Sequence, residues 1–149
     1  MVADQPDGQD SPAPDAPDAP ALDAPAPDGS RDETRDWAAA AAQAAATKTD
    51  EDTTVLEVGP VLGIVGYFVI TAGRNGRQVR AIAEEVEKLV AEAGGPKPVR
   101  IEGLDALEWV LMDYGDFVVH VFNAEARRFY DLERLWRDVP RVAWRPDPA

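Results

Sequence analysis

Residues 109–122 read Trp-Val-Leu-Met-Asp-Tyr-Gly-Asp-Phe-Val-Val-His-Val-Phe, and this stretch decides the fold that the sequence predicts. Two runs rich in aromatic and aliphatic residues flank Gly115-Asp116, a two-residue loop of a kind that β-hairpins favour. If Tyr114 and Phe117 close the loop, the register of the whole hairpin follows. The predicted pairs are Asp113 with Val118, Met112 with Val119, Leu111 with His120, Val110 with Val121, and Trp109 with Phe122.

The two faces of this hairpin differ, because side chains alternate between the faces of a sheet. One face is wholly apolar or aromatic, and we expect it to be core; it carries Val110, Met112, Tyr114, Phe117, Val119 and Val121. The other face mixes large apolar groups with an acid and the only histidine; it carries Trp109, Leu111, Asp113, Val118, His120 and Phe122. Such a mixture suits a protein partner or a dimer contact. A second interpretation stays open, in which a helix covers this face and His120 is an interior residue.

The segments around the hairpin predict an α/β fold, with a mixed sheet of about five strands and helices packed on it. Residues 77–93 carry an apolar stripe at helical spacing, formed by Val79, Ile82, Ala83, Val86, Leu89, Val90 and Ala93. A capping box at Ser30 and Glu33 precedes an Ala-rich helix that runs to Ala46. A last helix is predicted over residues 124–136. Strands are predicted over residues 53–58, 67–71, 99–101, 108–114 and 117–122.

The net charge of −13 comes from 28 Asp and Glu against 15 Lys and Arg, and it is unevenly spread. Residues 1–55 hold 13 of the acids and only 3 of the basic residues. Residues 1–29 are low in complexity and rich in Pro, Ala and Asp, which predicts a disordered acidic arm. We therefore expect three parts: this arm, a folded domain over residues 30–138, and an irregular C-terminal tail over residues 139–149.

Composition excludes several classes of protein. The chain has no cysteine, so disulfides, thiol nucleophiles and cysteine-bound metals are absent. We expect no secretory signal, because the N-terminus has neither a basic nor an apolar region. Residues 58–73 are uncharged, but they are fewer than the roughly 20 that cross a bilayer, so no membrane segment is expected. The acidity argues against DNA or another phosphate backbone as a non-specific partner.

No catalytic, metal or cofactor site is predicted. Asp113 and His120 share a face but are offset by two positions, and Asp116 lies in the turn. The turn at residues 73–76 lacks the lysine of a phosphate loop. Arginines cluster at the start of the following helix, where a salt partner or an anionic ligand would offset them; they are Arg74, Arg77 and Arg80. Charges alternate along the last helix, which is typical of a solvated face; they are Arg127, Arg128, Arg134, Glu125, Asp131 and Glu133.

A series of short motifs carries a resemblance to a known family. In order, they are Gly66-Tyr67-Phe68-Val69-Ile70, Arg77-Gln78-Val79-Arg80-Ala81-Ile82-Ala83, Ile101-Glu102-Gly103, Trp109-Val110-Leu111-Met112-Asp113-Tyr114-Gly115-Asp116, Val119-His120-Val121-Phe122 and Phe129-Tyr130-Asp131-Leu132-Glu133-Arg134-Leu135-Trp136. From about residue 31 to 137 the chain resembles the ribosomal silencing factor family, also called Iojap-like. The resemblance implies a nucleotidyltransferase-like fold without that activity.

The resemblance also implies a function. Members bind the large ribosomal subunit through the ribosomal protein numbered fourteen, block the joining of the small subunit, and lower translation when nutrients are limiting. They often form homodimers when free. We therefore expect a cytoplasmic, non-enzymatic repressor of translation. One alternative from another class is a degenerate nucleotide-handling enzyme of the same fold, and a further alternative is a dimeric interaction module with no ribosomal role.

When the chain is aligned with the family position by position, the resemblance implies that the partner-binding surface lies in the segment from Trp109 to Asp116. The mixed hairpin face lies in the same segment. Trp109 and Leu111 are the expected anchors, and Tyr114 is expected to contribute only at the edge, because the register turns it towards the core. Two carboxylates, Asp113 and Asp116, would complement a basic ribosomal protein. The expected partner-binding residues are Trp109, Leu111, Asp113, Tyr114, Asp116 and His120. Two positions depart from the family pattern: Gly66 replaces an acidic residue, and Asn75 replaces a serine.

Overall fold

The computed structural model describes residues 28–145, with side chains described from Glu33 onward. The chain divides into two units, Met1–Arg31 and Asp32–Ala149. Within the first unit, only the start of helix α2 (Asp28–Ala46) belongs to the described residues. The predicted disordered arm therefore lies, up to residue 27, outside the described residues. The fold described below is that of the second unit.

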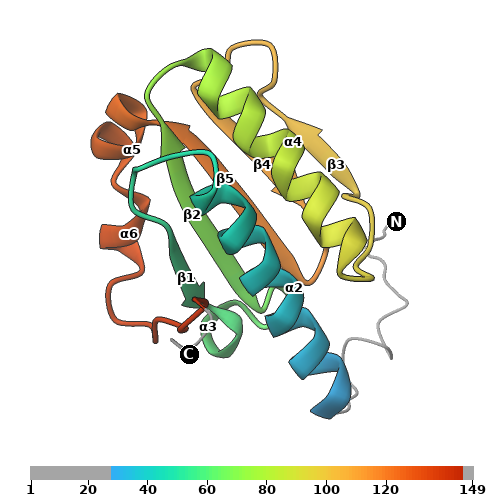
Figure 1. Cartoon of the computed structure of the whole chain (residues 1–149). Coiled ribbons are helices and arrows are strands. Elements are labelled where there is room, and N and C mark those ends of the chain that lie inside the picture. Colours follow the sequence, from blue (N-terminus) through green and yellow to red (C-terminus); the bar gives the residue numbers. More distant parts are fainter. Residues whose placement is uncertain (1–27, 146–149) are drawn as a thin grey trace, which may run out of the picture. The chain divides into compact units, whose positions relative to one another are not determined.

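A mixed five-stranded sheet forms the centre of the fold, as the sequence predicts (Figure 1). Its strands are β1 (Thr54–Glu57), β2 (Tyr67–Gly73), β3 (Arg100–Glu102), β4 (Trp109–Asp113) and β5 (Phe117–Asn123). Their order in the sheet is β1-β2-β5-β4-β3. The central pair, β2 and β5, is parallel, whereas the other pairs are antiparallel. Both central strands are free of charged residues, which fits strands that are covered on both faces.

The register of the hairpin is confirmed. The pairs are those predicted: Asp113 with Val118, Met112 with Val119, Leu111 with His120, Val110 with Val121, and Trp109 with Phe122. Tyr114 N–H donates to the Phe117 carbonyl over 2.9 Å and closes the loop. Gly115 has a φ of +88°, which glycine adopts without strain.

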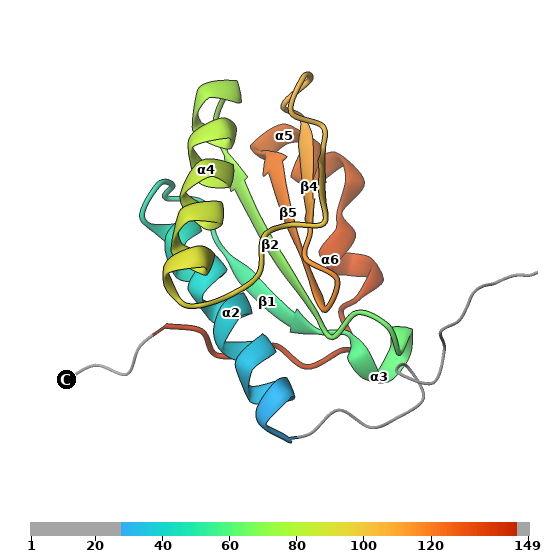
Figure 2. The ribbon, with the colours of Figure 1, turned by 90° about the vertical axis from the view of Figure 1, so that its right-hand side faces the viewer.

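Helices cover the two faces of the sheet differently (Figure 2). Helix α2 and helix α4 (Gly76–Glu92) lie on one face, and helices α5 (Ala124–Tyr130) and α6 (Leu132–Leu135) lie on the other. The predicted stripe of α4 is buried except at its C-terminal part, where Leu89 is half-buried and Ala93 is exposed. Helix α2 packs through five fully buried alanines, whose small side chains allow a close approach: Ala38, Ala41, Ala42, Ala44 and Ala45.

The prediction of one helix over residues 124–136 is wrong. The chain breaks at Asp131, whose φ of +49° lies in the left-handed region that aspartate tolerates better than most residues. Its N–H ends α5 by donating to the Arg127 carbonyl over 2.8 Å. The break re-aims the chain, so that Leu132 and Trp136 pack on the sheet. Another short helix, α3 (Gly59–Leu62), lies within the turn-rich connection expected between the first two strands.

Over residues 140–145, the last that the structure describes, the only regular structure is one bridge between Leu56 and Arg141. This segment nevertheless lies along the outer edge of β1. Val142 N–H donates to the Val55 carbonyl over 2.8 Å, and Glu57 N–H donates to the Pro140 carbonyl over 2.9 Å. Trp144 Nε1 donates to the Thr53 carbonyl over 3.0 Å. The segment predicted as a tail thus covers a strand edge that would otherwise carry unpaired backbone groups.

No helix among the described residues has both the length and the apolar character that spanning a membrane requires.

Candidate functional site

The inward face of the β4–β5 hairpin is core, as predicted. All six residues assigned to it are at most 4 % exposed: Val110, Met112, Tyr114, Phe117, Val119 and Val121. They pack against the buried stripe of α4 and the alanines of α2. This side of the hairpin therefore holds the domain together and is closed to partners.

The outward face is covered over only part of its width: the interpretation in which helices cover it is confirmed for that part, and the rest is open. Helices α5 and α6 cover the side formed by β1, β2 and β5, where Ile70 and Phe122 are fully buried. Beyond β5 the cover ends. Leu111 and Asp113 on β4 are half-buried, and the side chains of Arg100 and Glu102 on β3 are about 60 % exposed. These four residues form what we call the open face.

Trp109 stands between the covered side and the open face. Its ring lies 4.8 Å from that of Phe122 and 5.0 Å from that of Tyr130, measured between centroids. Its Nε1 donates to His120 Nδ1 over 3.1 Å. Gly103, at a φ of +93°, lies against the start of β4, where a Cβ would collide with the Trp109 carbonyl oxygen. The half-buried indole is thus held from several directions and keeps one edge available.

His120 lies beneath Trp109 and is only 5 % exposed. Phe68 packs edge-on against its ring at 4.7 Å. Burial lowers the pKa of His120 to about 4, so the ring is neutral at physiological pH. Because Nδ1 accepts from Trp109, the proton resides on Nε2, which is buried without a hydrogen-bond partner among the described residues. His120 therefore supports Trp109 from below, and its own side chain does not reach the surface.

Tyr114 is buried as well, on the inward side. Its ring stacks on Phe117 at 4.5 Å with an interplanar angle of 5°. Burial, with a contribution from the charge of Glu87, raises the pKa of its hydroxyl well above the usual range. Of the six predicted partner-binding residues, Tyr114 and His120 are thus out of reach of a rigid partner. Trp109, Leu111, Asp113 and Asp116 are accessible.

The two carboxylates lie at the tip of the hairpin. Asp113 accepts from Gly115 N–H over 2.8 Å, and its other oxygen lies 3.5 Å from Arg100 Nε. Asp116 is exposed, and its backbone carbonyl accepts from Gly66 N–H over 2.8 Å. A Cβ at Gly66 would lie 3.4 Å from that carbonyl, which is ordinary contact, so the backbone here has room for a side chain.

The second departure from the family pattern lies at the start of α4. Asn75 is the N-cap of α4, and its Oδ1 accepts from Gln78 N–H over 2.9 Å. A serine hydroxyl can fill the same role. Of the arginines near this helix start, Arg80 donates to the Leu104 carbonyl over 3.3 Å. Across the described residues, no group of three His, Asp or Glu side chains is placed to hold a metal ion.

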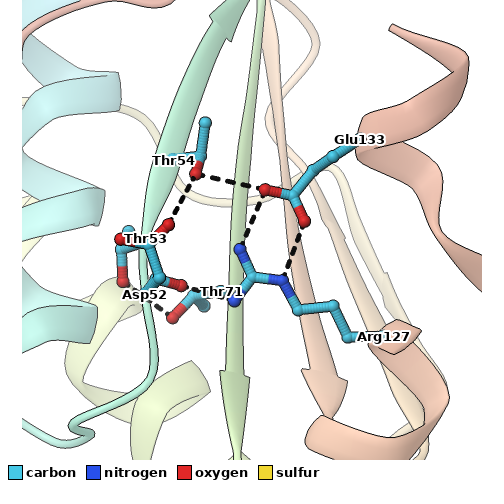
Figure 3. A network of polar contacts seen from close by, with 6 residues as sticks. All are labelled: Asp52, Thr53, Thr54, Thr71, Arg127 and Glu133. Atoms are coloured by element: carbon cyan, nitrogen blue, oxygen red, sulfur yellow. Dashed lines mark hydrogen bonds and ion pairs between the residues drawn. The ribbon is translucent and has the colours of Figure 1, made fainter. Parts of the chain in front are cut away.

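One ion pair fastens α5 and α6 to the sheet (Figure 3). Arg127 donates twice to the Glu133 carboxylate, from Nε and from Nη2, at 3.0 Å each. Thr54 of β1 donates to the same carboxylate over 3.2 Å, and Arg127 Nη1 donates to the Asp52 carbonyl. The two side chains are only 11 % and 22 % exposed. The prediction of a solvated helix face is therefore wrong for Arg127 and Glu133, which meet only because the chain breaks at Asp131.

A groove along α5 and α6 was missed in the sequence. It is open to solvent, has a volume of about 710 Å³ and is lined by aromatic, aliphatic, arginine and aspartate residues between positions 128 and 138. Phe129 is 80 % exposed, Leu135 is 76 % exposed and Tyr130 is 49 % exposed. The apolar residues at positions 129 and 135 gave no local signal of exposure, because apolar residues on a helix are expected to be buried.

Comparisons with known proteins converge. A family model described as "Ribosomal silencing factor during starvation" matches residues 31–148. The "Ribosomal silencing factor RsfS" of Bacillus subtilis is 42 % identical over 100 residues, which cover 67 % of this chain and 84 % of that protein. The protein of the same description from Halalkalibacterium halodurans is 42 % identical over 95 residues, covering 64 % and 80 %. A crystal structure of a Chromobacterium violaceum protein superimposes with a TM-score of 0.65 at 33 % identity, covering 69 % and 85 %.

Proposed function

The chain belongs to the ribosomal silencing factor family, and from this premise we propose that it represses translation by binding the large ribosomal subunit. The bound protein blocks the joining of the small subunit by occupying the surface on which the two subunits meet. It contacts the ribosomal protein numbered fourteen, acts in the cytoplasm, and lowers translation when nutrients are limiting. When it is free, it forms a homodimer.

The open face is the observation that supports this proposal most directly. It combines the half-buried Leu111 with the edge of Trp109, and it is the part of the sheet that α5 and α6 leave uncovered. Aromatic and aliphatic anchors of this kind supply most of the binding energy in protein interfaces. Asp113 and Asp116 lie at its border and complement a basic ribosomal protein.

Steric blocking requires no chemical step. It requires that the protein bind the large subunit tightly enough to compete with the small subunit, and that it remain bound. The rigid backing of Trp109 favours this, because an ordered side chain loses little conformational freedom on binding.

Leu111→Ala is the direct test of the proposal. Truncation of an interface anchor costs about 1–3 kcal/mol, so we expect roughly tenfold or more weaker cosedimentation with purified large subunits. Subunit joining should recover in parallel. Leu89→Ala is the matched control, because it removes the same atoms from a half-buried leucine on α4, across the sheet.

Asp116→Asn isolates the electrostatic contribution. The side chain of Asp116 is exposed, so its neutralisation should leave the fold intact and weaken large-subunit binding more at low salt than at high salt. Glu84→Gln, on the exposed side of α4, is the control of equal charge change. If Leu111→Ala and Asp116→Asn both sediment with the large subunit as the controls do, the open face is not the docking surface.

A further inference from the structure

The groove along α5 and α6 differs in character from the open face. Three arginines and three large exposed apolar side chains line it: Arg128, Arg134, Arg137, Phe129, Tyr130 and Leu135. Its volume of about 710 Å³ falls within the range of roughly 300–1,000 Å³ that is usual for ligand sites. No side chain of the described residues fills it.

The arginines of the groove are not used within the fold. In the described part of the chain, Arg128, Arg134 and Arg137 form no ion pair, whereas the adjacent Arg127 is fully engaged by Glu133. The guanidinium group is a planar donor that binds phosphate oxygens two at a time, and it gives up its hydration more easily than an ammonium group. Three such groups around one hollow are suited to an anionic ligand with several phosphates.

The local charge is positive although the chain is acidic. Residues 127–141 contain five arginines and three carboxylates, in a chain whose net charge is −13. At physiological ionic strength, exposed charges more than about 8 Å apart are largely screened from each other. A ligand in the groove therefore interacts mainly with its arginines, with Asp131 and Asp138 in the same lining as the opposing charges.

The aromatic side chains of the groove are held in place. Phe129 packs edge-on against Tyr130 at 5.1 Å, and Tyr130 in turn lies 5.0 Å from Trp109. The ring of Phe129 thus rests edge-on against one supporting ring, that of Tyr130, and is 80 % exposed. A supported ring of this kind offers a surface on which a nucleobase stacks, and such stacking contributes about 1–3 kcal/mol per base.

We propose that this groove binds a single-stranded or looped segment of RNA on the large ribosomal subunit, with phosphates on Arg128, Arg134 and Arg137 and a base on Phe129. This rests on the proposed function. An acidic peptide could pair with the arginines, but it would leave the exposed ring of Phe129 without a stacking partner. RNA offers both phosphates for the guanidinium groups and a base for the ring. The two surfaces then have opposite preferences: carboxylates at the open face meet a basic protein, and the groove meets RNA. Because Trp109 contacts Tyr130, the open face and the groove are adjacent, so one large ribosomal subunit can contact both.

Binding of the full-length chain to a fluorescent single-stranded RNA of mixed sequence, at several salt concentrations, tests the proposal. The triple variant Arg128→Gln, Arg134→Gln, Arg137→Gln should bind at least tenfold more weakly. Its slope of log affinity against log salt should fall by about 2, as expected for three lost contacts to single-strand phosphates. The control of equal charge change is the triple variant Arg74→Gln, Arg77→Gln, Arg80→Gln at the start of α4. It should retain the wild-type salt slope.

The aromatic contribution has its own test. Phe129→Leu keeps an apolar side chain but removes the stacking surface, so it should weaken RNA binding by fivefold or more. Phe129→Trp keeps an aromatic stacking surface, so it should bind RNA as the wild type does. If the wild type does not bind RNA, or if the groove and control triples bind it equally, the proposal is wrong. If the groove triple binds RNA normally but loses the large subunit, the occupant is a protein and the RNA proposal is again wrong. Leu111→Ala should keep RNA binding, so failure of the docking proposal is separately visible.

Discussion

His120 shows how a single buried residue can act through its neighbour. The neutral imidazole offers one lone pair, and the Trp109 indole donates to it over 3.1 Å. The other nitrogen carries a proton that finds no acceptor among the described residues. A buried N–H without an acceptor costs stability in a core, whereas the hydrogen bond at the other nitrogen orients Trp109.

We predict that His120→Leu and His120→Asn differ in function. Leucine leaves the indole N–H without an acceptor, so Trp109 should move more freely, and large-subunit binding should weaken by about tenfold. Asparagine can place its Oδ1 near the position of Nδ1 and should retain most of the binding. Cosedimentation, with tryptophan emission as a reporter of the indole environment, measures both effects. Equal binding by the two variants would show that the hydrogen bond does not position Trp109.

His120 also predicts how stability depends on pH. Its pKa is about 6.5 when unfolded and about 4 when folded, so between these values the unfolded chain binds the proton first. Above about pH 6.5 the ring is neutral in both states, and the free energy of unfolding is at its full value. As the pH falls towards about 4, protonation of the unfolded chain lowers this free energy. Both His120 variants should remove this dependence of stability on pH, since neither leucine nor asparagine titrates. Urea midpoints at pH 7 and pH 5 measure it; a wild type that loses no more stability than the variants would contradict the prediction.

At the scale of elements, the attachment of α5 and α6 depends on the pair between Arg127 and Glu133. Burial opposes ionisation of Glu133, but hydrogen bonds from Arg127 and Thr54 and the charges of Arg127 and Arg141 outweigh it and lower its pKa. The carboxylate therefore stabilises the fold above its unfolded pKa, near 4.5. The contribution is lost as the pH falls through the lower, folded value.

Arg127→Gln should destabilise the domain by about 2 kcal/mol, because it removes charge-assisted hydrogen bonds from a mostly buried carboxylate. Amide exchange should speed up in α5 and α6 more than in α4, since only the former lose their attachment. Arg128→Gln, one residue along, is the matched control, because Arg128 is exposed and unpaired among the described residues. Equal destabilisation by the two variants would contradict a role for the pair.

Local sequence patterns predicted most of the helices and strands, but not where the last helix breaks or which tertiary contacts its two parts make. The hairpin register followed from one two-residue loop and the alternation of side chains, and it proved correct for every pair. The break at Asp131 could not be foreseen, since the alternating charges on either side fit an unbroken helix. What decides the break is tertiary: Leu132 and Trp136 reach the sheet, and Glu133 reaches Thr54.

The candidate site was predicted by residue but not by accessibility. The sequence placed Trp109, Leu111, Asp113 and His120 on one face, where the structure has them. It could not show that α5 and α6 end their cover between β5 and β4, because no local pattern encodes where a helix lies across a sheet. For the same reason the groove at Phe129 and Leu135 passed for an ordinary helix surface.

At the scale of the whole domain, the segment around Trp144 joins parts that are far apart in sequence. Trp144 Nε1 bonds to the carbonyl of Thr53, and Gln43 donates to the Trp144 carbonyl over 2.8 Å, across 101 residues. Trp144→Ala should therefore destabilise the whole domain by about 2–4 kcal/mol, whereas Trp144→Phe, which keeps an aromatic ring but loses the Nε1 hydrogen bond and part of the packed surface, should cost about 1–2 kcal/mol. Urea unfolding measures both. If Trp144→Ala unfolds at the wild-type midpoint, this segment is a dispensable attachment.

The parallel pair at the centre of the sheet has a consequence for how fast the protein becomes active. Each residue of β2 is paired with one 50 positions later in β5. Closing so long a loop precedes any gain from the contact, so folding is expected in milliseconds or longer rather than microseconds. The hairpin that bears Trp109 and Leu111 forms locally, but β5 becomes a fixed platform only once β2 has joined it. A newly made chain would thus complete the open face, its proposed docking surface, late in its own folding.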